Sequence, residues 1–190
     1  RSVVEKAAIV YFVGVFLFVG AYTWLRPDYN WDMVAYVATA LENRYQDPQA
    51  LHAETWREIE QGARESQLYN LQYGNPYNRH QWENPVDFQS QLSMYRVKVG
   101  YIALMRLMEP VTGLVTASLL ISILPLLGIG ALTLYWLGRE KALQAALLLA
   151  PVFVVADIAH MSAAVTPDLL MALLSLAALY WISKGRDAAA

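Results

Sequence analysis

Uncharged apolar runs alternate with one polar stretch along the chain, and this pattern predicts helices that cross a membrane. Residues 7–25 and 110–138 contain no charged side chain, and residues 142–156 and 169–183 are shorter runs of the same kind. About 20 apolar residues span a bilayer as an α-helix. We therefore predict an all-α integral membrane protein with about four transmembrane helices and a large helical extracytoplasmic insert between the first and the second.

The boundaries of these segments follow from the positions where charge returns. We place the transmembrane helices at residues 1–26, 110–138, 142–160 and 166–183, the insert at residues 27–109, and a cytoplasmic tail at residues 184–190. The first helix has the position of a signal peptide. However, no small-residue cleavage site follows it, and Tyr22 and Trp24 are typical of an interfacial anchor.

Lysine and arginine flank the predicted helices at three places. Arg1 and Lys6 precede the uncharged run of the first helix, Arg139 and Lys141 lie in the turn between the second and the third, and Lys184 and Arg186 follow the fourth. Short cytoplasmic segments carry an excess of these cations. We therefore expect both termini in the cytoplasm and the insert on the outer side.

Composition narrows the function classes. Hydrophobic residues make up 57% of the chain and charged residues 16%, whereas a soluble domain carries about 25% charged residues. A net charge of −2 without a basic block argues against a nucleic-acid partner. The chain has no cysteine, and its histidines lack the spacing of a metal site, so we expect no metal and no cofactor.

The polar insert has helical periodicity over most of its length. Residues 31–43 carry an apolar face after Asn30, a typical N-cap, and residues 49–68 predict a second, more charged helix. Residues 69–85, rich in Tyr, Asn, Gly and Pro, indicate an irregular loop. Residues 88–108 carry an apolar stripe with cations beside it, which is typical of a helix in the membrane interface.

Four acidic residues fall near the outer ends of the predicted spans. Asp28 and Asp32 follow the first helix, Asp157 lies near the end of the third, and Asp168 begins the fourth. Ionisable groups at the membrane edge of a helical bundle are functional candidates, and we expect these four to share one depth. Helix capping is the alternative for Asp32 and Asp168, and contact with interfacial water or a partner is the alternative for Asp157.

Three cations of the insert are candidates for binding a lipid phosphate. They are Arg96, Lys98 and Arg106, and general attraction to anionic headgroups is the alternative. The aromatic segment 69–82 is a candidate for stacking on a sugar, or for an interfacial or protein contact. We expect His52 to be solvated on its charged helix.

Two short stretches give the chain a resemblance to a known class of enzyme. PDYNWDMVAYVATALE follows the first helix and holds Asp32 and Tyr36, and VTPDLLMALLSLAALYW begins the fourth with Thr166–Pro167–Asp168. The chain resembles the N-terminal part of a GT-C-type membrane glycosyltransferase, in particular the bacterial members. The class includes protein mannosyltransferases, arabinosyltransferases and lipid A aminoarabinose transferases.

The resemblance implies an enzyme of the bacterial inner membrane that transfers a sugar from a polyprenyl-phosphate donor at the outer leaflet. It implies that Asp32, with Asp28 as the second choice, is the catalytic base on an acceptor hydroxyl. Members of the class carry more spans than these, so the chain is expected to be the N-terminal part of such an enzyme or a reduced relative.

The remaining site candidates are assigned to substrate binding. By their chemistry, Arg96 or Lys98 is suited to stabilise the departing phosphate. Tyr36, Asp157 and Asp168 complete this set.

The second hypothesis is a non-catalytic accessory subunit of a larger membrane complex, such as a respiratory, photosynthetic or transport assembly. The apolar spans and the lack of a cofactor motif favour it, and its helices and aromatic insert would pack against partner subunits. Membrane lipids are expected partners under both hypotheses, and a lipid-linked sugar donor only under the first. A transporter or channel is disfavoured because the spans lack charge at their midplane.

Overall fold

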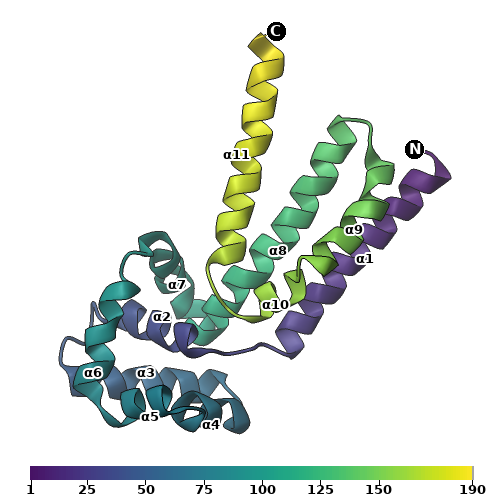
Figure 1. Ribbon diagram of the computed structural model, residues 1–190. Coiled ribbons are helices and arrows are strands. Elements are labelled where there is room, and N and C mark those ends of the chain that lie inside the picture. Colours follow the sequence, from purple (N-terminus) through teal and green to yellow (C-terminus); the bar gives the residue numbers. More distant parts are fainter. Residues whose placement is uncertain (190) are drawn as a thin grey trace. The chain divides into compact units, whose positions relative to one another are not determined.

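The protein is all-helical in its computed structural model, which describes residues 1–189 and the side chains of residues 1–185. Helices make up 83% of the chain, and residues 1–189 contain no β-strand. The chain divides into two compact units (Figure 1): unit 1 comprises Arg1–Pro27 and Ser122–Ala190, and unit 2 comprises Asp28–Ile121. Of the predicted tail, residue 190 and the side chain of Arg186 lie outside the described residues.

Three helices within the described residues are long and apolar enough to cross a membrane, which indicates an integral membrane protein. They are α1 (Val3–Leu25), α8 (Leu114–Arg139) and α11 (Asp168–Ala189), the last over Asp168–Gly185. The first begins at a capping box: the Ser2 hydroxyl accepts the Glu5 N–H at 3.2 Å, and the Glu5 carboxylate accepts the Ser2 N–H at 2.8 Å.

After α8 the chain of unit 1 returns along α1 in an interrupted helix. Its parts are η2 (Leu143–Ala145), α9 (Ala146–Val155) and α10 (Ile158–Ala163), and all three contact α1. Figure 1 shows α9 and α10 beside α1. This segment corresponds to the third predicted span.

Side-chain contacts fix the direction of this return segment. The Thr23 hydroxyl, near the end of α1, hydrogen-bonds the Ser162 hydroxyl of α10. Further along, Phe12 and Phe16 lie with their ring centroids 6.1 and 5.2 Å from that of Phe153 in α9. The return segment therefore runs parallel to α1, in the same direction, and extends along most of it.

The third predicted span, residues 142–160, is not one continuous helix. Asp157, between α9 and α10, has a left-handed backbone with φ 60° and ψ 37°. Aspartate tolerates this region better than most residues do, and a left-handed residue ends a run of α-helix. Hydropathy does not reveal the break because both flanking helices are apolar.

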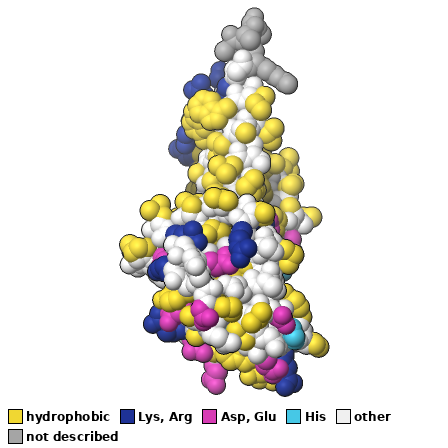
Figure 2. Space-filling model, turned by 90° about the vertical axis from the view of Figure 1, so that its left-hand side faces the viewer, with side chains coloured by type: hydrophobic (Ala, Val, Ile, Leu, Met, Phe, Trp, Pro, Cys, Tyr) yellow, Lys and Arg dark blue, Asp and Glu magenta, His cyan; other side chains and the backbone are white. Residues whose placement is uncertain are grey.

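Unit 2 is built from short helices packed around a buried one. Its elements are α2 (Trp31–Leu41), α3 (Pro48–Gly62), α4 (Glu65–Tyr73), α5 (Pro76–Glu83), α6 (Pro85–Ser90), the 3₁₀ turn η1 (Gln91–Met94), α7 (Val99–Thr112) and the start of α8. Every residue from Met33 to Leu41 in α2 is buried, and α2 contacts α3, α7 and η1. Figure 2 shows acidic side chains on the face of unit 2.

The predicted irregular loop at residues 69–85 is wrong, because the segment holds the end of α4 and all of α5. The Asn75 side chain accepts the Asn78 N–H at 2.9 Å, and Pro76 takes the first helical position. Proline at that position loses no helical hydrogen bond. The Asn–Pro pairs that indicate a loop in the sequence are therefore helix starts here.

The predicted single helix at residues 88–108 is also wrong, since it is divided among α6, η1 and α7. Of its apolar stripe, Tyr101 is buried and Met94 is exposed. The Gln91 side chain is buried and accepts a hydrogen bond from Trp31 Nε1 at 2.9 Å. The single helix was predicted from the spacing of apolar residues alone, and that spacing gives no sign of a buried, hydrogen-bonded glutamine.

Candidate functional site

Asp32 lies in the first turn of α2, and its side chain is half-buried. The N-cap of α2 is Asn30, whose Oδ1 accepts the Met33 N–H at 3.1 Å. Asp32 gains from the helix dipole, but capping alone does not account for it. Its Oδ1 accepts a hydrogen bond from the Tyr95 hydroxyl at 2.8 Å.

Tyr95 fixes the Asp32 carboxylate through a hydroxyl that stays protonated. Burial, and then the hydrogen bond to Asp32, raise the pKa of Tyr95 far above its usual value. The hydroxyl is therefore a donor at neutral pH, and it engages one of the two carboxylate oxygens. A carboxylate held in this way is a positioned proton acceptor.

Aromatic rings connect Asp32 to Lys98. The Tyr95 ring meets the buried Tyr36 ring edge to face, with centroids 5.2 Å apart, and Tyr36 meets Tyr101 at 4.8 Å. Lys98 Nζ lies 5.9 Å from the centroid of Tyr36, within the range of a cation–π contact. The fold thus gathers three of the candidate residues, Asp32, Tyr36 and Lys98, into one group.

Arg96 lies apart from this group. Its Nε and Nη2 donate to the two carboxylate oxygens of Glu42 at 2.9 and 2.6 Å. Glu42 is the C-cap of α2, whereas Asp32 is in its first turn, so the two lie about 15 Å apart along the helix at about 1.5 Å per residue. The sequence made Arg96 and Lys98 equal candidates for the departing phosphate, but the two side chains have different surroundings in the structure.

A pocket of about 390 Å³ lies beside the C-terminal end of α2 in unit 2. Arg106 lines it and donates to the carbonyl oxygens of Ala40 at 2.8 Å and Thr39 at 2.9 Å, which satisfies the end of the helix. Arg96 and Glu42 line the same pocket. Both guanidinium groups therefore donate to acceptors within unit 2, so Arg96 and Arg106 have a structural role that does not require a lipid phosphate.

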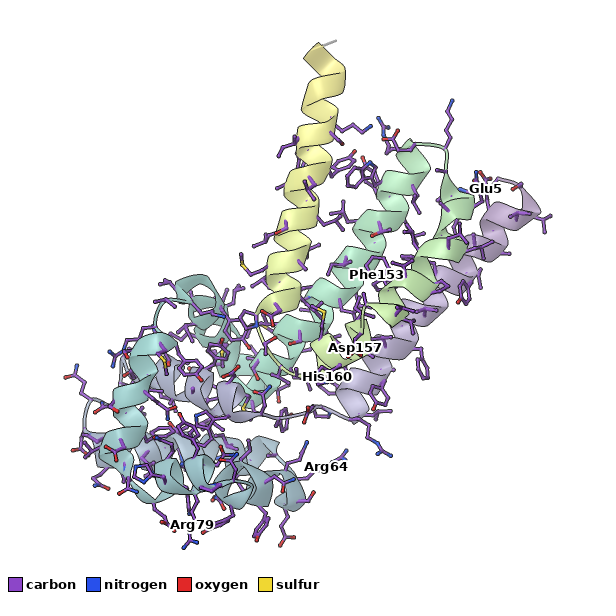
Figure 3. The ribbon with its side chains drawn as sticks, viewed as in Figure 1. Glu5, Arg64, Arg79, Phe153, Asp157 and His160 are labelled. Carbon is purple, nitrogen blue, oxygen red and sulfur yellow. The ribbon has the colours of Figure 1, made fainter. Side chains whose placement is uncertain are left out.

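The other acidic candidates are exposed and are divided between the units. Asp28 belongs to unit 2, and Asp157 and Asp168 belong to unit 1. Asp168, the first residue of α11, accepts a hydrogen bond from the Thr166 hydroxyl at 2.8 Å. Figure 3 shows Asp157 and His160 near the junction of α9 and α10. A common depth for the four carboxylates stays a prediction.

His52 is not simply solvated, as its charged helix led us to expect. Its half-buried ring lies 5.4 Å from Trp82 and 5.1 Å from Phe88, and its Nε2 accepts a hydrogen bond from Trp56 Nε1 at 3.1 Å. Burial lowers the pKa of His52 below its usual value. Trp82, from the aromatic segment 69–82, packs against these rings rather than standing free for a sugar.

Sequence reasoning missed Tyr95 and Glu42. Tyr95 is 63 residues from Asp32, and Glu42 is 54 residues from Arg96. Neither belongs to a motif, and their roles depend on how α2 packs against the segment before α7. Within the described residues, no cluster of three or more metal-ligating side chains occurs.

Comparison of the chain with protein-family models, with curated proteins and with solved structures returned no match. The resemblance to GT-C-type enzymes therefore rests on the layout of the chain, on the residues around Asp32 and on Thr166–Pro167–Asp168.

Proposed function

We propose that the chain is a GT-C-like glycosyltransferase, or the N-terminal part of one, that transfers a sugar from a polyprenyl-phosphate donor at the outer leaflet. The observation that supports this best is the Asp32 carboxylate. It is half-buried, it lies in the helix that follows the first apolar span, and the Tyr95 hydroxyl holds it at 2.8 Å. Asp28 is exposed and lies before α2, which makes it the second choice.

In this proposal Asp32 is the general base. Its Oδ2 accepts the proton of the acceptor hydroxyl while the acceptor oxygen bonds to the anomeric carbon of the sugar. The bond from that carbon to the phosphate oxygen breaks, and its electron pair leaves with the polyprenyl phosphate. No metal is needed to balance these steps.

Lys98 is the preferred cation for the departing phosphate, because it belongs to the same group of side chains as Asp32 through Tyr95 and Tyr36. A positioned ammonium stabilises developing negative charge electrostatically. Arg96 is less suited because its guanidinium is engaged by Glu42. Asp157 and Asp168 remain proposed substrate contacts.

We propose four crossings, with η2, α9 and α10 forming the third. Two features of unit 1 support this. The interrupted segment runs parallel to α1, as a third crossing must, and contacts it through all three of its parts. Arg139 and Lys141 line one pocket with the start of α1, and an excess of cations favours the cytoplasm for that end. Both termini are then cytoplasmic, and residues 27–109 are periplasmic in a bacterial inner membrane.

The absence of native cysteine makes this topology testable by labelling. Single substitutions Ser66→Cys and Lys141→Cys put thiols at exposed positions of the insert and of the turn after α8. In intact spheroplasts, an impermeant maleimide should label Ser66→Cys and spare Lys141→Cys until the membrane is opened. The reverse pattern would overturn the orientation.

The catalytic assignment is tested with two variants. Asp32→Asn keeps the shape of the side chain and removes the base, which should lower transfer by about 10²–10⁴-fold. Asp28→Asn should leave most activity, because Asp28 is exposed and outside α2. Loss of activity in Asp28→Asn with retention in Asp32→Asn would move the base to Asp28.

The accessory-subunit hypothesis remains as a second candidate because of α11. Only 11% of its apolar window is buried within the chain, so its surface is available to the helices of a partner as well as to lipid. Under this hypothesis the protein copurifies stoichiometrically with a complex in mild detergent. Migration of the isolated chain as a monomer would count against it.

A further inference from the structure

A basic pocket of about 390 Å³ lies at the end of unit 1 where α1 begins and α8 ends. Arg1, Arg139 and Lys141 contribute cations to its lining, and Glu5 contributes one carboxylate. Leu134 and Leu143 add an apolar part. The pocket therefore combines several positive charges with an aliphatic surface.

The acidic groups at this end already have hydrogen-bond or ion-pair partners within the chain. The Glu5 carboxylate accepts the Ser2 N–H at 2.8 Å in the capping box of α1. The neighbouring Glu140 pairs with Lys184 at 2.6 Å. The pocket thus keeps a net positive lining, which favours an anionic ligand.

Aromatic side chains mark the depth of this end in a membrane. Tyr180 meets Tyr135 with ring centroids 5.6 Å apart, Trp136 at 5.5 Å and Trp181 at 5.5 Å. Clusters of Tyr and Trp at the ends of membrane helices lie at the level of the lipid headgroups. Tyr135 also lines the pocket, so the cations lie at the height of lipid phosphates.

Lys141 has a backbone conformation that favours glycine. Its φ is 54°, and the Ala142 N–H donates to the Leu137 carbonyl at 2.8 Å across the turn that ends α8. Glycine is the usual residue at such a C-terminal position because it pays no steric penalty there. A lysine at this position places a cation in the lining of the pocket but strains the backbone. Strained residues of this kind are often found at functional sites.

We propose that this pocket binds the phosphate group of an anionic phospholipid, with Arg139 and Lys141 as the main contacts. Basic pockets between membrane helices on the cytoplasmic side bind lipid headgroups of this kind. Leu134 and Leu143 contact the glycerol and the first methylenes, and the acyl chains follow the apolar helices. The site is separate from Asp32 and does not depend on the proposed catalytic function.

The test uses the full chain in a neutral detergent, titrated with phosphatidylglycerol or phosphatidylcholine while native mass spectrometry counts the bound lipids. Phosphatidylglycerol should bind more tightly. Arg139→Gln/Lys141→Gln should weaken its binding by about 25-fold, at about fivefold for each cation removed. Arg57→Gln/Arg79→Gln, the same charge change on exposed arginines of unit 2, should have no effect.

Two further variants separate binding from folding. Lys141→Gly removes the charge and relieves the strained backbone, so its fold is retained while binding weakens about fivefold. Lys141→Arg keeps the charge and should keep the affinity. Unchanged binding in Lys141→Gly and in the double variant would overturn the proposal, as would equal affinity for the two lipids.

A competition experiment distinguishes a lipid from free phosphate. Excess inorganic phosphate should displace little phosphatidylglycerol, because the acyl chains contribute to lipid binding. Complete displacement would show a site for a soluble anion and would overturn the assignment to a lipid.

Discussion

Replacing Tyr95 with phenylalanine removes the hydroxyl that holds Asp32 and leaves the aromatic ring in place. The lost contact is a hydrogen bond of 2.8 Å to a carboxylate, and bonds to charged groups contribute about 1.5–3 kcal/mol. Both side chains are only partly buried, so we expect the lower end, about 1.5 kcal/mol. The edge-to-face contact with Tyr36 should survive because phenylalanine keeps the ring.

A double-mutant cycle isolates this bond from other effects of the substitutions. The full chain, Tyr95→Phe, Asp32→Ala and the double variant are unfolded by denaturant in mild detergent and followed by tryptophan fluorescence. We expect a coupling energy of about 1–2 kcal/mol between the two sites. Tyr69→Phe, which alters an exposed ring, is the matched control and should change stability by less than about 0.5 kcal/mol.

A coupling energy within about 0.5 kcal/mol of zero would show that the two side chains act independently, because independent sites are additive to that extent. Tyr95 would then not position Asp32. The Asp32 carboxylate would then not be held in position to accept a proton.

Three further substitutions test other parts of the structure. Lys141→Gly should stabilise the protein by about 1 kcal/mol in denaturant unfolding, because it relieves a positive φ; destabilisation would contradict the strain. Gly130→Ala should lower the free energy of unfolding by about 1–3 kcal/mol, since the added Cβ would lie 2.8 Å from the Phe16 ring. Gly14→Ala, where the added Cβ meets open space, should leave stability unchanged or raise it. Burial lowers the pKa of His52 in the folded protein, so the unfolded state binds the proton at a higher pH and the stability of the fold decreases as the pH drops below about 6.5. In His52→Gln this loss of stability between about pH 7 and pH 5 should be smaller. An unchanged dependence of stability on pH would exclude His52 as its source.

The membrane-length helices are the part of the fold that hydropathy predicts well. α1 covers the first long uncharged run, α8 covers residues 114–138 of the second, and α11 covers the last run. This works because a helix in lipid must be apolar over its whole length. The same criterion does not detect the break at Asp157, because a backbone change between two apolar helices leaves hydropathy unchanged.

The insert was harder to predict because its helices are short and their ends depend on local caps. Asn75–Pro76 begins a helix where composition indicated a loop. The 3₁₀ turn η1 interrupts residues 88–108, which periodicity predicted to be one helix. Asp32 was recognised as a candidate from its place after the first span. Its partner Tyr95 was not, because a hydrogen bond across 63 residues leaves no local signal.

The central claim is that Asp32 acts as the base in transfer from a polyprenyl-phosphate sugar. The most direct measurement is the release of polyprenyl phosphate by the full chain in proteoliposomes, with and without an acceptor. The wild-type protein should turn over, and Asp32→Asn should be slower by about 10²–10⁴-fold. Asp87→Asn, at an exposed carboxylate of the same unit, should match the wild type. Equal turnover in Asp32→Asn and the wild type would show that Asp32 is not the base.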